Sequence, residues 1–199
     1  MPDIHSICWS CGVSRAPTDA LCPACGKVQP PPPAGTALDK FALLGFAPSF
    51  DEPEAVDDKF RTLSRKLHPD RFVRAPAQER RYSLEQTTLL NDAYKTLKDP
   101  VRRAEHLLSL RGVRGDPKMS PQFLEETMED REKLLEAKMS GNGVEELARG
   151  VREKRDSTLA EVRALVARGG DLAQAAELLA RMRYYARYLD EVEGRTAEI

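Results

Sequence analysis

The chain has 199 residues, of which 41% are hydrophobic, 32% charged and only 6% aromatic, and its 31 basic residues are balanced by 32 acidic ones. This balance, without an extended basic stripe, argues against nucleic acid as a partner. No run of about 18 apolar residues and no basic-then-apolar start is present, so we expect a cytoplasmic protein with neither a membrane span nor a secretory signal. A composition rich in Ala, Leu, Glu and Arg predicts an all-α fold with a small N-terminal appendage.

The cysteines are confined to the first 25 residues, where two C-x-x-C-G motifs contain Cys8, Cys11, Cys22 and Cys25. Two residues between ligands let one turn present both sulfurs to a tetrahedral ion, and the following glycine permits a positive φ. A segment of about 30 residues cannot form a hydrophobic core unaided, whereas a structural zinc site supplies ~10–16 kcal/mol of binding energy. We therefore predict a structural Zn²⁺ bound by the four cysteines in a module over residues 1–29. Two disulfides, a redox pair and an iron site remain alternatives.

A proline run, from Pro30 to Pro33, follows this module. Such a run can form neither a helix nor a sheet interior, and it predicts a stiff polyproline spacer over residues 30–37. It also resembles ligands of proline-binding domains, but a linker at a domain boundary is the simpler interpretation. We expect the spacer to separate the cysteine module from the helices that follow.

An apolar stripe with helical spacing comes next, at Val56, Phe60, Leu63 and Leu67. Asp51 stands three residues before Glu54, with Pro53 between them, which is typical of a capping box and predicts a helix start near residue 52. The helix should end at His68, because Pro69 has no N–H to continue the hydrogen-bond ladder and disfavours the α region before it.

A second long amphipathic helix is predicted before Asp99-Pro100, with its stripe at Tyr82, Leu89, Leu90, Ala93, Tyr94 and Leu97. Neither helix can bury its stripe alone, so the two should pack as an antiparallel hairpin. The tip of that hairpin would be the tripeptide His68, Pro69 and Asp70.

A basic face leads into this tip. Arg61, Arg65 and His68 fall in one column of the first helix. Six lysines and arginines between residues 57 and 74 outnumber three aspartates, an excess of three positive charges. Such a patch suits an acidic partner, and an exposed carboxylate at Asp70 can accept paired bonds from an arginine of that partner.

A short apolar element at residues 39–45 precedes the hairpin, and the run Leu90-Asn-Asp-Ala-Tyr-Lys-Thr-Leu-Lys-Asp-Pro100 completes it. With these residues, this part of the chain resembles the J domain of DnaJ-type co-chaperones. The resemblance implies that the His-Pro-Asp loop stimulates ATP hydrolysis by a DnaK-type chaperone. The residues expected to contact that chaperone are Arg61, Arg65, His68, Pro69, Asp70 and Arg71. A third amphipathic piece ends at Gly112, so we assign residues 38–112 to the J domain and its connecting helix.

Three long helices are predicted in the remainder, residues 113–199. The first begins after Ser120-Pro121 and runs to about Met139, the second ends at Gly169-Gly170, and the last begins after Asp171. Leu172, Ala175, Leu179, Met182, Ala186 and Leu189 form the seam of the last helix. Short turns join the helices, which predicts an antiparallel three-helix bundle with Tyr184 and Tyr188 on the outer side of the last helix.

The run from Asp99 to Gly112, the run from Phe123 to Glu132, and Arg181-Met-Arg-Tyr-Tyr185 resemble HscB (Jac-type) co-chaperones. That resemblance implies two partners: an HscA- or DnaK-type chaperone for the J domain and the iron–sulfur scaffold protein IscU for the bundle. The expected scaffold-binding residues are Leu124, Met128 and Tyr184 with a rim of Glu129, Glu132 and Glu136. Glu125 departs from the family, where an apolar residue is common.

Two other functions are compatible with parts of the sequence. One is a general DnaJ-like co-chaperone that delivers unfolded clients. The other is a dithiol oxidoreductase using C-x-x-C, which is disfavoured by the four-sulfur arrangement and by the lack of a βαβ pattern around either pair. No nucleophile, phosphate loop or carboxylate pair indicates an enzyme, so we expect a stimulator of another protein's ATPase.

Overall fold

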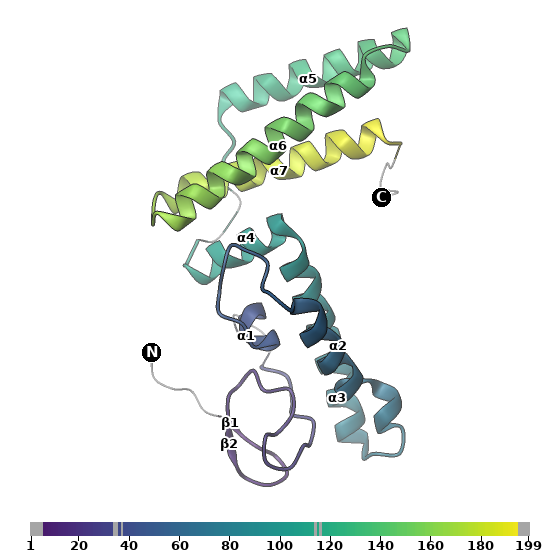
Figure 1. The fold of residues 1–199 in the computed structure, drawn as a ribbon, viewed down its shortest axis with the longest axis vertical. Helices are drawn as coiled ribbons and strands as arrows, with labels where there is room; N and C mark the ends of the chain where they lie inside the picture. Colours follow the sequence, from purple (N-terminus) through teal and green to yellow (C-terminus); the bar gives the residue numbers. More distant parts are fainter. Residues whose placement is uncertain (1–5, 34–35, 37, 114, 116, 195–199) are drawn as a thin grey trace. The chain divides into compact units, whose positions relative to one another are not determined.

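The computed structural model describes residues 6–33, 36, 38–113, 115 and 117–194. It is mostly helical with a small N-terminal part, as predicted, and it divides into two compact units, Met1–Leu110 and Arg111–Ile199 (Figure 1). Within the described residues, no helix is both long and apolar enough to cross a bilayer.

The N-terminal part contains one antiparallel strand pair, β1 (Ser6–Ile7) with β2 (Ser14–Arg15). Each C-x-x-C-G motif forms a tight turn, in which the glycine N–H donates to the carbonyl of the first cysteine at 3.0 Å for Gly12 and 2.9 Å for Gly26. Both glycines have a positive φ, 73° and 71°, which a residue with a Cβ adopts only at a cost. The expected role of these glycines is confirmed.

The helices of the first unit are α1 (Lys40–Leu44), α2 (Val56–Leu67), α3 (Ala77–Lys98) and α4 (Pro100–Leu110), with the 3₁₀ turn η1 (Pro69–Phe72) between α2 and α3. The predicted hairpin is confirmed: α2 packs against α3, and His68 caps the end of α2 at the proline. Their shared core contains Phe41, Leu44, Val56, Leu67, Tyr82, Leu90, Ala93 and Leu97, together with Val28 from the cysteine module.

The start of α2 differs from the prediction. The helix begins at Val56, not near residue 52, and no side chain caps it. Lys98 on α3 instead binds the carboxylates of Glu52 (2.6 Å) and Asp57 (3.4 Å). The predicted start was wrong because Ala55 has a φ of 61°, in the left-handed region, which interrupts α-helix geometry just before Val56.

The proline run does not keep the cysteine module apart from the helices, so that prediction is wrong. Val28 is fully buried in the helical core, and Lys27 forms an ion pair with Glu79 of α3 at 2.9 Å. Gln86 of α3 donates from Nε2 to the Gln29 carbonyl at 3.0 Å. The residues just before the prolines are therefore anchored on α3, and the module and hairpin form one unit.

The second unit contains α5 (Pro121–Ser140), α6 (Val144–Ala167) and α7 (Leu172–Val192). Ser120 and Asp171 cap α5 and α7 with their side chains, as predicted. Glycines with positive φ, at 141 and 169, allow the tight turns that reverse the chain between successive helices. The antiparallel three-helix arrangement is confirmed.

The predicted seam of α7 is confirmed at Ala175, Leu179, Met182 and Leu189, which are buried, but the buried face differs from it near the C-terminal end. Ala186 is exposed, whereas Tyr185 and Tyr188 are buried and Tyr184 is half-buried. The expectation that Tyr188 lies on the outer side is therefore wrong. A strict 3.5-residue spacing drifts from the 3.6-residue period of a straight helix, and burying a tyrosine ring removes far more apolar surface from water than burying an alanine methyl.

Candidate functional site

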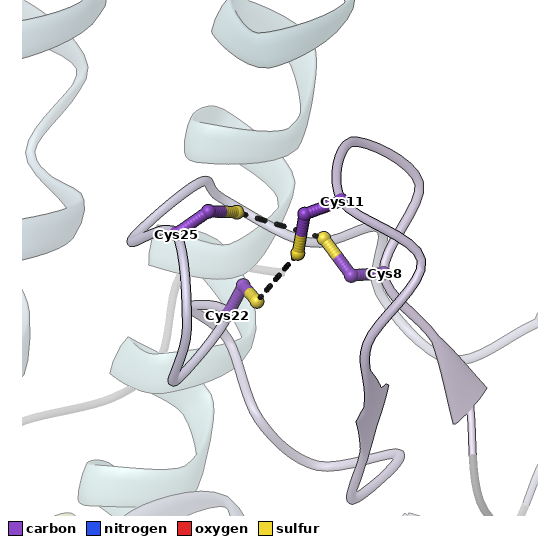
Figure 2. Close-up of side chains that lie close together, drawn as sticks. All are labelled: Cys8, Cys11, Cys22 and Cys25. Carbon is purple, nitrogen blue, oxygen red and sulfur yellow. Dashed lines mark hydrogen bonds between the residues drawn. The ribbon is translucent and has the colours of Figure 1, made fainter.

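Four cysteine side chains from the two C-x-x-C-G turns point toward a common centre (Figure 2). The Sγ atoms of Cys8 and Cys25 are 3.8 Å apart, those of Cys11 and Cys22 are 3.6 Å apart, and all four lie within 4.8 Å of one another. Zn–S bonds of about 2.3 Å in a tetrahedron place the sulfurs about 3.8 Å apart. The cluster therefore fits a tetrahedral metal ion.

The electrostatics of the cluster also suit a cation. Burial acts to raise the pKa of the Cys8 thiol, but hydrogen bonds led by the Cys11 N–H lower it to about 6. The N–H of Cys25 is the main cause that lowers the pKa of Cys22. The Val13 N–H acts to lower the pKa of Cys11, yet the neighbouring sulfurs and burial raise it to about 12. Four thiolates repel one another, so a bound dication is needed for all of them to ionise together.

A chain of buried polar contacts runs from this cluster into α3. Gln29 donates from Nε2 to the Cys8 sulfur at 3.3 Å, and its carbonyl accepts from Gln86 of α3. On the same helix, Ser83 and Thr87 both donate to the carbonyl of Leu67, at 2.6 and 3.2 Å. These bonds fix the end of α2 from which the His-Pro-Asp loop emerges. The sequence contained no signal for them, because each joins residues at least 16 positions apart.

The His-Pro-Asp loop is ordered internally and open to solvent. His68 accepts from the Asp70 N–H with Nδ1 at 3.3 Å, and the Arg71 N–H donates to the His68 carbonyl at 3.0 Å. The side chains of His68 and Asp70 are 53% and 86% exposed. The Asp70 carboxylate is thus held on a short rigid turn with most of its surface free for a partner.

The basic face of α2 is also exposed next to this loop. Arg65 donates from Nε to the Arg61 carbonyl at 3.3 Å, and Arg61 lies 3.6 Å from Asp58. These surface contacts are weak in water, so the guanidinium groups can exchange them for a partner's carboxylates. Arg71 is exposed as well, and Pro69 is half-buried at the start of the turn.

A groove of about 430 Å³ lies between α5 and α7 in the second unit. Met128 and Tyr184 both line it, so two of the predicted scaffold-binding residues are brought together. The Tyr184 hydroxyl donates to the Thr127 carbonyl at 3.0 Å, and its ring packs edge-on against Phe123. Burial raises the pKa of Tyr184, with the nearby carboxylate of Asp130 adding to the effect, so the phenol stays protonated.

The remaining predicted residues of this surface lie outside the groove. Leu124 is exposed one turn before Met128, and Glu129, Glu132 and Glu136 are exposed along α5. The groove lining also includes Tyr188, which the sequence placed on the outer side of the helix, and Arg131 and Arg187, to which it gave no role. Their proximity depends on how α7 packs against α5, which the spacing of residues along one helix does not determine.

Comparison with known proteins agrees with this geometry. The family model for the DnaJ domain matches residues 39–106, and that for the HSCB C-terminal oligomerisation domain matches residues 119–193. The mouse iron-sulfur cluster co-chaperone protein HscB is 34% identical over 194 residues, covering 94% of this chain and 81% of that protein. The chain belongs to the HscB family of co-chaperones.

Other HscB proteins resemble it over different lengths. The HscB homolog of Shewanella pealeana is 34% identical over 165 residues, which cover 78% of this chain and 95% of that protein. Among solved structures, human HscB superposes with a TM-score of 0.83 at 32% identity, covering 98% of this chain and 100% of the other. HscB from Vibrio cholerae superposes with a TM-score of 0.72 at 32% identity, covering 79% and 96%.

Proposed function

We propose that this chain is a co-chaperone of iron–sulfur cluster assembly with three working parts. The loop of His68, Pro69 and Asp70 stimulates the ATPase of an HscA- or DnaK-type chaperone. The α5–α7 surface delivers an IscU-type scaffold protein to that chaperone, and a structural Zn²⁺ holds the cysteine module together. The observation that carries the proposal is the presence, in one chain, of an exposed His-Pro-Asp loop on a J-type hairpin and an HscB C-terminal domain.

The geometry supports the chaperone role through the exposed carboxylate of Asp70. Its side chain is 86% exposed, with one oxygen 3.5 Å from His68 Nδ1, so it can accept from an arginine of the chaperone, and Arg61 and Arg65 offer positive charge on the adjoining helix. Removing one partner of a charge pair that is buried at an interface typically costs about 2–5 kcal/mol, whereas rim charges mainly speed association. Asp70 should therefore matter most, and the two arginines should have a graded effect.

The test is a steady-state assay of the chaperone ATPase with the full-length protein. Asp70→Asn and His68→Gln should abolish stimulation with an unchanged melting temperature, because both side chains are exposed, and Arg61→Ala should be intermediate. Asp156→Asn, an equally conservative change at an exposed aspartate of α6, is the matched control and should stimulate normally. Normal stimulation by Asp70→Asn would reject this role.

Scaffold binding is supported by an apolar centre with an acidic rim. Met128 lines the groove with Tyr184, Leu124 is exposed one turn before it on α5, and Glu129, Glu132 and Glu136 follow on the same helix. Buried apolar anchors supply affinity in such interfaces, and charges supply steering.

Calorimetry with a purified IscU-type protein tests this directly. Leu124→Ala/Met128→Ala/Tyr184→Ala should abolish binding while ATPase stimulation by the J domain is retained. Because Tyr184 also contacts Thr127 and Phe123, the double variant Leu124→Ala/Met128→Ala, which changes only exposed side chains, is measured in parallel. Wild-type affinity in the folded double variant contradicts the assignment.

A second candidate is a general co-chaperone for unfolded clients. It is favoured by apolar side chains that lie exposed on the cysteine module, among them Ile7 and Val13. A competition experiment distinguishes the two functions, with a labelled IscU-type protein bound to the full-length chain. Displacement by the unlabelled scaffold protein alone supports scaffold delivery, and displacement by a denatured protein as well supports the general role.

A further inference from the structure

The outer surface of α5 has a row of four large apolar side chains. Leu124, Met128, Leu135 and Met139 are 50%, 66%, 61% and 81% exposed. At 100° per residue the four lie within about 60° of one another, and the row extends over about 22 Å of helix. Only the first two belong to the scaffold surface proposed above. Leu135 and Met139, which we call the distal pair, have no role in it.

The distal pair is not part of the bundle core. The buried residues of α5 are Phe123, Leu134 and Ala137, which lie on a different face of the helix. Scattered exposed apolar residues are normal on protein surfaces, but two apolar pairs aligned on one helix face, with Arg131 between them, are typical of an interaction site.

A row of glutamates runs beside the apolar row along the same length of helix. Glu125, Glu129, Glu132 and Glu136 are all exposed, and helical geometry places them on one flank of the row. Of these four, Glu129 has an ion pair with Lys133, at 3.4 Å on the helix surface. The acidic flank therefore accompanies both the first pair of apolar residues and the distal pair, so the two halves form one continuous surface.

We propose that the scaffold protein binds along the whole exposed length of α5, with Leu135 and Met139 as a second anchor. This rests on the proposed function and extends the apolar part of its site, from Met128 to Met139, by about three turns of helix. The occupant is a face of the scaffold that is apolar at its centre and basic along one edge, because the glutamate row requires positive charge opposite it. A second copy of this chain is the poorer match, since its own α5 carries the same acidic row.

The experiment uses the full-length protein and a purified IscU-type protein in isothermal titration calorimetry. Leu135→Ala/Met139→Ala should weaken binding by about 10- to 100-fold, comparably to Leu124→Ala/Met128→Ala. The matched control is Val73→Ala/Leu84→Ala in the first unit, whose side chains are equally exposed at 66% and 60%, and it should bind the scaffold normally. Leu135→Gln/Met139→Gln provides a second variant that keeps the side chains long while removing their apolar surface.

The exposed glutamates beside the apolar row provide a second test. Glu132→Gln/Glu136→Gln should slow association with the scaffold and reduce its dependence on salt concentration, because these carboxylates steer the encounter. An unchanged salt dependence contradicts the acidic flank as part of the surface.

The outcomes distinguish this inference from the function on which it rests. Wild-type affinity in the distal-pair variant, with weakened binding in Leu124→Ala/Met128→Ala, overturns the extension and leaves the scaffold site standing. Wild-type affinity in both variants overturns the extension and the scaffold site together. Sedimentation velocity compares the oligomeric states of the wild-type protein and the distal-pair variant. If the wild type is a dimer, the variant is a monomer and scaffold affinity is unchanged, a second copy of the chain covers the row and the inference is overturned.

Discussion

Removal of the metal from the cysteine cluster should destabilise α3 as well as the cysteine module. We expect the module to unfold without a metal ion that joins its four sulfurs, because so short a segment buries little apolar surface. Because Lys27, Val28 and Gln29 hold the module on the helical hairpin, their contacts with α3 and the core are lost when the module unfolds.

The size of the effect follows from three contacts. Returning the fully buried Val28 side chain to water costs about 1.5–3 kcal/mol, and the hydrogen bond from Gln86 to the Gln29 carbonyl contributes about 1 kcal/mol. The ion pair of Lys27 with Glu79 adds only about 0.5–1 kcal/mol, since the lysine side chain is partly exposed. Together they amount to about 3–5 kcal/mol, which lowers the melting temperature of a domain of this size by more than about 10 °C.

Hydrogen exchange measured by mass spectrometry on the intact protein reports both units in one sample. After chelation, with metal loss verified by elemental analysis, the most protected amides of α3 should exchange about 100-fold faster or more. The amides of α6, in the other unit, are the internal control and should be unaffected. Unchanged exchange in α3 after verified metal loss would refute the coupling, and purified protein without zinc would refute the zinc assignment.

Two further predictions concern single side chains of the first unit. Ser83→Ala removes a buried hydrogen bond to the Leu67 carbonyl, so it should lower stability to chemical denaturation by about 1 kcal/mol and weaken stimulation of the chaperone ATPase. His106 accepts from the Lys40 N–H at 2.9 Å, and burial, with Lys40 nearby, lowers its pKa below the usual 6.5. The unfolded chain therefore binds a proton more readily than the folded one, so stability should be constant well above pH 6.5 and decrease as the pH falls below about 6.5.

Each of these predictions has a matched control. Thr88→Ala changes an exposed hydroxyl on the same helix as Ser83 and should leave stability and stimulation unchanged. If Ser83→Ala stimulates normally, the bond does not position the loop. His106→Gln, which keeps a polar acceptor without titrating near neutrality, should flatten the pH dependence of stability between pH 5 and 7 (roughly the range of histidine titration). The same decrease in that variant would place the effect elsewhere.

The local features of this protein were readable from sequence. Pro69 ends α2 because a proline lacks the N–H that a helix interior requires. The turns at Gly12 and Gly26 follow from the freedom of glycine at positive φ, and Ser120 and Asp171 cap their helices through hydroxyl and carboxylate oxygens. In each case the decisive atoms lie within four residues of one another, so the sequence alone contains the necessary information.

The tertiary structure decided the features that depend on residues far apart in the chain. Lys98 links Glu52, in the segment before α2, to α3, and Gln86 attaches the cysteine module by binding Gln29. The packing of α7 buries Tyr188, which the heptad pattern placed on the outer side, and brings Arg187 to the groove. Such contacts depend on how the faces of different helices pack together and on which buried polar groups form hydrogen bonds. Neither can be derived from the spacing of residues along a single helix.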